Sequence, residues 1–258
     1  MKLAFSNIGF ENADEERVYE LLQEYKFEGL EIAPSKFIGE NPYSKPHAAA
    51  KKARELKHNF GLQIPSMQSI WYGQRGNIFS DADAKKLEEY TAKAVKFASA
   101  VGCKSLVFGC PRNRYIPVGG KADDALTFFA NTAIMCAQNG VRLALEANPA
   151  VYGTNFVNTS AQAFEFAKKV PNLYVNYDLG ACITNGETLD ILAENLPLVS
   201  HIHISEPQLA AVKKRGEHKQ IADILKRGGY DNFVSIEMKT SAFDEVKTAV
   251  ECIAEAFA

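Results

Sequence analysis

The sequence lacks an excess of basic residues, a long apolar run and any paired cysteine motif. Its formal net charge over 258 residues is -2, whereas a protein that binds duplex DNA needs a clustered basic face. No stretch reaches the ~20 apolar residues of a membrane helix. The N-terminal segment MKLAFSNIGF has neither the basic start nor the apolar stretch of a secretory signal. We therefore expect no nucleic-acid partner and no membrane partner.

Cysteine is sparse and scattered along the chain. The sequence has five cysteines, and no two of them form a CxxC pair, so neither a disulfide framework nor a zinc knuckle is indicated. Unpaired thiols are typical of a reducing compartment, which predicts a cytoplasmic protein. The composition leaves open whether the chain forms a homo-oligomer.

What the sequence does contain is a regular alternation of short apolar segments and amphipathic segments. The apolar segments are rich in Val, Ile, Leu and Phe and mostly lack polar alternation, which is typical of strands covered on both faces in a parallel sheet. Eight segments are predicted to be strands: Leu3–Ser6, Gly29–Ala33, Gln63–Met67, Ser105–Phe108, Arg142–Glu146, Leu173–Tyr177, His201–Ile204 and Phe233–Glu237.

Eight such units predict an α/β fold, a single (β/α)8 TIM barrel that forms one domain over residues 1–258. Barrels of this kind typically need ~250 residues. An open, doubly wound sheet is the alternative, but the GxGxxG loop of that fold is missing after the first strand. No Pro- and Gly-rich linker divides the chain.

Four of the predicted strands carry a metal-binding residue type at the same end. These residues are Glu146, Asp178, His203 and Glu237. A buried carboxylate costs several kcal/mol unless it is paired, and adjacent strands lie ~4.8 Å apart, so one cation could serve all four side chains. Three oxygen ligands and one imidazole favour one divalent ion such as Mn2+, Mg2+ or Co2+, with Zn2+ also compatible.

Polar residues at three more strand ends are predicted to bind substrate, since barrel enzymes place their sites at the carboxyl ends of the strands. Glu31, in FEGLEI, could hydrogen-bond a polyol or form a salt bridge with a neighbouring lysine. Gln68 and Asn148 are neutral hydrogen-bonding groups that suit a hydroxyl-rich ligand.

The long loops after the strands supply further candidates for substrate binding. Arg112 and Arg114, in GCPRNR, could clamp a phosphate or carboxylate, although loop arginines are commonly just solvated. Trp71, in QSIWYG, could form an apolar wall for a sugar ring or pack over the barrel mouth. His218, in RGEHKQ, could reach the site as a proton carrier or lie exposed in a first helical turn. His201 is expected to be structural.

The order and spacing of several motifs resemble the xylose isomerase-like barrels, specifically the sugar phosphate isomerase/epimerase group within the superfamily of AP endonuclease family 2. The motifs are FEGLEIAPSKF, IPSMQSIWYG, LEANPAVYGTNFVNT, YDLG, HIHISEP and GYDNFVSIEM, and the resemblance covers nearly the whole chain. It implies that Glu146, Asp178, His203 and Glu237 bind a divalent metal. It also implies that the two glutamates flank the substrate and exchange protons with it.

Two positions differ from the ketohexose epimerases of this group. Ala181 stands where those enzymes carry a histidine, three residues after the strand-six aspartate, and the SEPQLAAV segment has no arginine where they carry one. Both positions contact the sugar in those enzymes. The resemblance therefore implies the metal chemistry and leaves the substrate open among free sugars, phosphorylated sugars and other derivatives.

Together these features predict a divalent-metal-dependent isomerase or epimerase of a sugar or sugar derivative. The reaction would pass through a cis-enediolate, with Glu146 and Glu237 as acid and base. A lyase or dehydratase using the same enolate chemistry and a barrel that binds a sugar without turnover are the alternatives. Phosphodiester cleavage, as in AP endonucleases, is disfavoured because a trinuclear zinc site needs many histidines and the chain has five.

Overall fold

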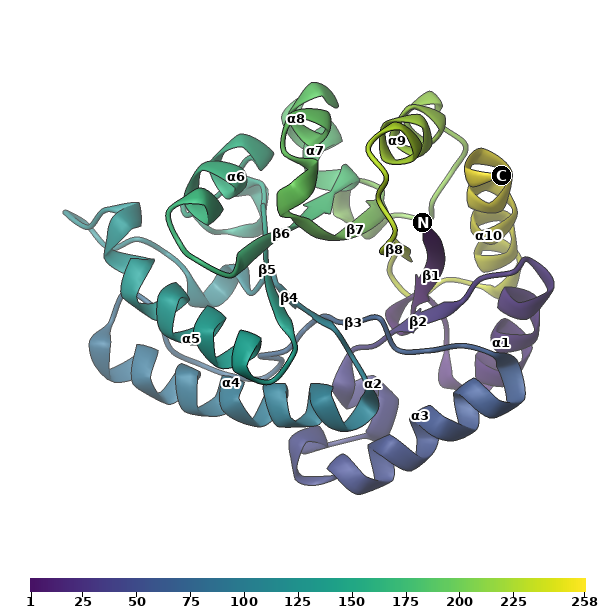
Figure 1. Ribbon diagram of the computed structural model, residues 1–258, viewed down its shortest axis with the longest axis horizontal. Helices are drawn as coiled ribbons and strands as arrows, with labels where there is room; N and C mark the ends of the chain where they lie inside the picture. Colours follow the sequence, from purple (N-terminus) through teal and green to yellow (C-terminus); the bar gives the residue numbers. More distant parts are fainter.

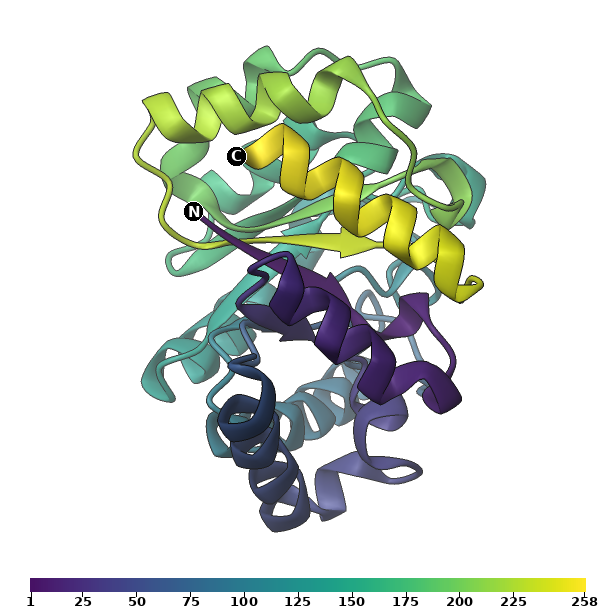
Figure 2. The ribbon, with the colours of Figure 1, turned by 90° about the vertical axis from the view of Figure 1, so that its right-hand side faces the viewer.

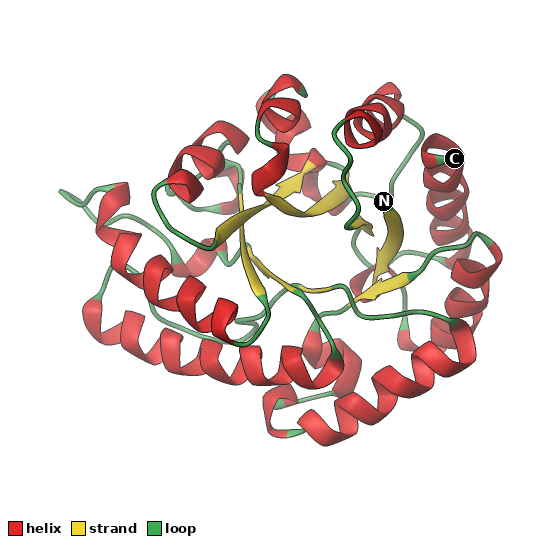
Figure 3. Cartoon of the chain, viewed as in Figure 1, coloured by secondary structure: helices red, strands yellow, loops and turns green.

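The computed structural model describes residues 1–258, and its strands form a ring with helices outside it (Figures 1 and 3). All strand pairs are parallel, in the order β2-β1-β8-β7-β6-β5-β4-β3. Isolated bridges Gly29–Gln63 and Ile32–Met67 join β2 to β3. The predicted (β/α)8 TIM barrel is confirmed. The strands are β1 (Lys2–Ser6), β2 (Gly29–Glu31), β3 (Ser66–Met67), β4 (Ser105–Phe108), β5 (Arg142–Glu146), β6 (Leu173–Asp178), β7 (Val199–Ser205) and β8 (Phe233–Glu237).

Ten α-helices cover the ring. The last of them lies beside the first (Figure 2), where the Tyr25 hydroxyl donates to Glu251 Oε1 at 2.9 Å. None of the helices is both long and apolar enough to cross a membrane. The helices are α1 (Glu15–Glu24), α2 (Pro34–Ile38), α3 (Pro46–Phe60), α4 (Asp81–Val101), α5 (Leu126–Gln138), α6 (Ser160–Lys168), α7 (Leu179–Asn185), α8 (Asp190–Glu194), α9 (Gly216–Arg227) and α10 (Phe243–Phe257).

The strands differ in length from those predicted, and one difference matters for the site. Strand β7 begins two residues earlier than predicted and ends one residue later, at Ser205. His203 is therefore two residues short of the strand end, opposite Ser235 in the register with β8. Because side chains alternate along a strand, His203 points into the barrel below the rim rather than at it.

The main apolar packing lies between the strands and the outer helices. Aromatic side chains from β4, α5, α6 and nearby loops pack in one layer, most of them edge to face, with ring centroids 4.8–6.1 Å apart, within the range in which such pairs are favourable. This layer fixes the end of β4 and the loop that follows β3. Its members are Trp71, Phe108, Phe128, Phe129, Phe156 and Phe166.

The interior of the barrel is unusually polar. Ser105 and Ser200 contact each other through their hydroxyls at 3.1 Å, and His201 Nε2 lies 3.0 Å from the hydroxyls of both Ser66 and Ser235. TIM barrels usually fill this space with branched apolar side chains. Buried polar groups are usually paired by hydrogen bonds, and these side chains are paired with one another inside the barrel.

Candidate active site at the carboxyl end of the barrel

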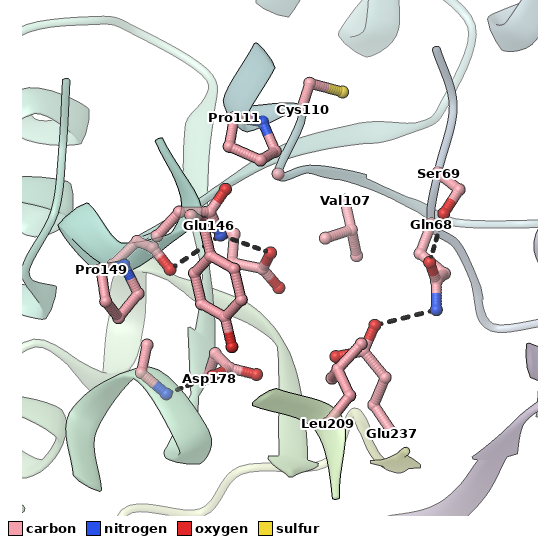
Figure 4. Close-up of a pocket in the computed structure, with 15 residues that line it drawn as sticks. Gln68, Ser69, Val107, Cys110, Pro111, Glu146, Pro149, Asp178, Leu209 and Glu237 are labelled. Atoms are coloured by element: carbon pink, nitrogen blue, oxygen red, sulfur yellow. Dashed lines mark hydrogen bonds between the residues drawn. The ribbon is translucent and has the colours of Figure 1, made fainter. Parts of the chain in front are cut away.

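A pocket of about 200 Å³ opens at the carboxyl end of strands β3 to β8. Its walls include Glu146, Asp178 and Glu237, whose carboxylates are directed into the same space (Figure 4). They end β5, β6 and β8. Active sites of barrels of this kind lie at this face.

The four predicted ligands are brought together here. One ligand atom from each of Glu146, Asp178, His203 and Glu237 lies within 4.8 Å of every other. His203 Nδ1 is 3.1 Å from Glu146 Oε1, 3.1 Å from Glu237 Oε2 and 3.8 Å from Asp178 Oδ2. Three carboxylate oxygens and one ring nitrogen thus converge on one point.

The other side of the His203 ring is fixed by Glu31. His203 Nε2 lies 3.0 Å from Glu31 Oε2, and both side chains are fully buried. Burial alone would raise the pKa of Glu31, but His203 and His201 outweigh it and hold that pKa below its usual range. An ionised carboxylate only accepts hydrogen bonds, so Nε2 carries the proton and Nδ1 faces the three carboxylates. A carboxylate behind a histidine is the usual support of a metal ligand.

The crowding of the three carboxylates favours a cation among them. Burial, followed by the charges of Glu146 and Glu237, raises the pKa of Asp178 to about 7. Burial likewise raises the pKa of Glu237, against the effect of His203. A divalent ion bound among the three carboxylates would remove the repulsion between their negative charges. The donor set and the orientation of His203 therefore fit one divalent metal, in agreement with the sequence.

Each glutamate has one oxygen toward His203 and one oxygen held by a neutral amide. Asn148 Nδ2 donates to Glu146 Oε2 at 3.1 Å, and Gln68 Nε2 donates to Glu237 Oε1 at 2.8 Å (Figure 4). Both amides line the pocket. Glu146 Oε2 and Glu237 Oε1 are therefore the two oxygens that face away from His203.

Strained backbone surrounds this pocket. Ser69, Cys110 and Leu209 line it and have positive φ values of 51°, 44° and 54°. Non-glycine residues rarely adopt this conformation, and where they do the surrounding structure must hold them. Here Leu209 is held by the backbone of Lys239, whose amide donates to its carbonyl at 2.8 Å. The loop after β7 is thus tied to the segment after β8.

Three predicted substrate-binding residues are placed away from the pocket. Trp71 is 3% exposed and packs against Phe108, and its indole donates to Thr91 at 2.8 Å, so its ring belongs to the aromatic layer. Glu31 lies inside the barrel and meets neither a lysine nor the pocket. His218 is buried on α9, 3.8 Å from the Cys252 sulfur on α10, so it is neither exposed nor near the site.

The two loop arginines have different environments. Arg114 is completely buried, and its Nη1 donates to the backbone carbonyl of Glu146 at 2.9 Å. It therefore supports the end of β5 from behind and cannot clamp a ligand in the pocket. Arg112 is exposed and lines a neighbouring groove.

Two polar residues of the site were missed by the sequence reasoning. Asn176, on β6, donates to Glu146 Oε1 at 2.7 Å and lies 3.1 Å from His203 Nδ1. Tyr152 lines the pocket, and its hydroxyl accepts from the backbone amide of Gln208 at 3.1 Å. The polar residue within the apolar run LYVNYD was a signal for Asn176. The position of Tyr152 soon after the strand that ends at Glu146 was a signal for Tyr152.

Residues 19–256 match the family model described as xylose isomerase-like TIM barrel. The chain belongs to this family. The resemblance found in the sequence is thereby confirmed at the family level. Among curated protein sequences, none matches the chain significantly.

Solved structures with this family's fold cover nearly the whole chain. A structure of L-ribulose 3-epimerase has a TM-score of 0.77 at 16% identity, covering 100% of this chain and 95% of that one. The apo form of 3-keto-D-glucoside 4-epimerase from E. coli has a TM-score of 0.75 at 17% identity, covering 99% and 98%. The IOLI protein with a bound zinc atom has a TM-score of 0.71 at 17% identity, covering 99% and 96%.

Proposed function

We propose that this protein is a divalent-metal-dependent isomerase or epimerase of a sugar or sugar derivative. The observation that carries the proposal is the convergence of Glu146, Asp178, His203 and Glu237, with ligand atoms within 4.8 Å of one another at the barrel mouth. Similar folds include two sugar epimerases, which supports the substrate class. The zinc in a third similar structure keeps Zn2+ among the candidates beside Mn2+, Mg2+ and Co2+.

The metal would be held by Glu146 Oε1, Asp178 Oδ2, His203 Nδ1 and Glu237 Oε2. When bound, it would supply positive charge to stabilise the oxyanion of an enediolate. Glu31 keeps the His203 ring in the orientation that this arrangement needs. Asn176, which donates to Glu146 Oε1, holds that oxygen beside the imidazole.

Proton transfer would fall to the two glutamates. Their remaining oxygens, Glu146 Oε2 and Glu237 Oε1, come from β5 and β8, with β6 and β7 between them. A substrate between them would be reached from two sides, so one carboxylate could remove a proton from carbon and the other return one. Asn148 and Gln68 orient these oxygens by hydrogen bonds. Two-sided access is what epimerisation at one carbon requires, and an aldose–ketose isomerisation can use the same pair.

The test is exchange of solvent deuterium into keto sugars, followed by NMR on protein loaded in turn with Mn2+, Mg2+, Co2+ and Zn2+. We expect deuterium at the carbon next to the carbonyl, with exchange lost in both Glu146→Gln and Glu237→Gln. NMR of the products separates epimers and isomers from products of water loss, which would instead identify a dehydratase. Full exchange in both variants would show that the glutamates do not transfer the proton. Metal binding without deuterium exchange in any sugar would favour a protein that binds a sugar without turnover.

A further inference from the structure

A second hollow, of about 730 Å³, opens beside the pocket that holds the carboxylates. Two loops line it, one after β3 (residues 69–76) and one after β4 (residues 110–113). Ser69, Cys110 and Pro111 line both the hollow and the pocket. The groove therefore adjoins the pocket, and a ligand seated at the carboxylates lies next to it.

The groove and the pocket carry opposite charge. Arg75 and Arg112 line the groove, and no Asp or Glu does. The pocket is lined by three carboxylates and by no basic side chain. Both arginines are exposed, and neither takes part in any of the molecule's salt bridges, which engage other residues. Asp83, at the start of α4, lies beside Gly76, and its carboxylate accepts a hydrogen bond from the backbone amide of Asn77 at 3.2 Å.

The two arginines are held on neighbouring loops by a buried side chain. Asn113 is 5% exposed, and its Nδ2 donates to the carbonyls of Gln74 and Gly76, at 3.4 and 2.9 Å. These carbonyls bracket Arg75, and Asn113 directly follows Arg112 in the chain. The backbone of Asn113 also accepts from Ile78 at 2.9 Å. Asn113 therefore joins the two backbone segments that carry Arg75 and Arg112.

Two positive charges that line one hollow and take part in no salt bridge repel each other, and an anion between them removes the repulsion. We propose that the groove around Arg75 and Arg112 is a subsite for a phosphate monoester on the substrate. Two guanidinium groups match the charge of a phosphate dianion, and each can donate to a pair of its oxygens, whereas a carboxylate would leave one positive charge unbalanced. The three carboxylates of the pocket repel an anion, so the phosphate lies at the end of the substrate away from the reacting carbon.

This inference rests on the proposed function, because it names the substrate as a phosphorylated sugar derivative. Its test needs no turnover of a substrate. Calorimetric titration of inorganic phosphate into the metal-free full chain, at low salt and pH 7.5, measures the subsite alone. We expect binding to the wild type, at least tenfold weaker binding to Arg75→Gln and to Arg112→Gln, and unchanged binding to the control Arg227→Gln, whose arginine is exposed at the end of α9.

The remaining outcomes decide between explanations. Equal phosphate affinity in the wild type and both groove variants overturns the subsite. Acetate that binds as tightly as phosphate, and depends on the same arginines, overturns the assignment to a phosphate dianion. Glu146→Gln is expected to retain phosphate binding, since its side chain lies in the pocket rather than the groove. Phosphate binding that depends on the arginines, together with no deuterium exchange in any phosphorylated sugar, leaves the subsite standing while the proposed reaction fails.

Discussion

Gly109 faces the carboxylate of Glu146 so closely that a Cβ at position 109 would lie 2.7 Å from Glu146 Oε2. The glycine directly follows β4 and leaves room for the oxygen that we assign to proton transfer. Its φ is not in the left-handed region, so the requirement is for space and not for backbone freedom. The atom in the way is the tip of a flexible side chain, which can move at little cost to the fold.

Gly109→Ala is therefore expected to displace Glu146 while leaving the protein folded. We predict an unchanged melting temperature within about 2 °C and a loss of solvent deuterium exchange of roughly a hundredfold, the usual effect of a misplaced catalytic group. Gly216→Ala is the matched control, because no atom lies within 4 Å of a Cβ there. Wild-type exchange rates in Gly109→Ala would contradict the role of Glu146 Oε2.

Removing the charge of Glu31 is expected to weaken metal binding from outside the ligand set. In Glu31→Gln, the amide no longer holds His203 in the tautomer that presents Nδ1, and loss of such a support typically weakens metal affinity by 10–100-fold. Calorimetric titration with Mn2+ measures this directly. Glu20→Gln, on the exposed face of α1, should bind as the wild type does, and equal affinity in both variants would show that Glu31 does not support His203.

One metal ion per chain should stabilise the fold, because the ligand atoms converge only in the folded state. At a concentration a hundred times its Kd, an ion that binds the folded state alone adds about 2.7 kcal/mol. We expect Mn2+ or Co2+ to raise the Tm, chelation to reverse the rise, and Asp178→Asn to reduce it, with the exposed Asp231→Asn as control. Elemental analysis giving three zinc ions per chain would instead indicate a trinuclear site.

The stability of the chain toward acid should depend on His218. Burial lowers the pKa of this histidine from its usual value of 6.5, so its neutral form is favoured in the folded state. The contribution of neutral His218 to the free energy of unfolding is then complete above pH 6.5. It is lost as the pH falls toward the lowered pKa, because the unfolded chain binds the proton first. Melting temperatures between pH 7.5 and 5 should fall less steeply in His218→Gln than in the wild type, whereas the exposed His58→Gln should follow the wild type. Parallel curves for all three would refute this contribution.

The sequence predicted the barrel and the meeting of the four predicted ligand residues for a simple physical reason. Glu146, Asp178 and Glu237 end their strands, and the ends of adjacent parallel strands meet at one rim. The contact between His203 and Glu31 could not be predicted in the same way. It crosses the barrel interior from β7 to β2, and it depends on the register and lengths of strands whose boundaries the sequence leaves uncertain by a few residues.

The sequence also did not predict the environments of individual side chains in the loops. Trp71 and Arg114 both follow strand ends, where a ligand-binding role is a reasonable expectation. Trp71 instead turns outward onto α4 and α5, because an aromatic layer is available there. Arg114 is buried through long-range packing with the end of β5. Loop conformation decides both outcomes, and short-range sequence patterns carry little information about it.

The joining of β2 to β3 limits how copies of this chain could associate. Backbone hydrogen bonds cross that join, including Leu30 to Gln63 at 2.9 Å and Gln68 to Ile32 at 3.0 Å. The ring therefore presents no unpaired strand edge to which a second chain could add by β-sheet pairing. Any self-association would have to use the outer faces of the helices or the loops at the two ends of the barrel, and only the loops at the carboxyl end would bring a second copy to the mouth of the pocket.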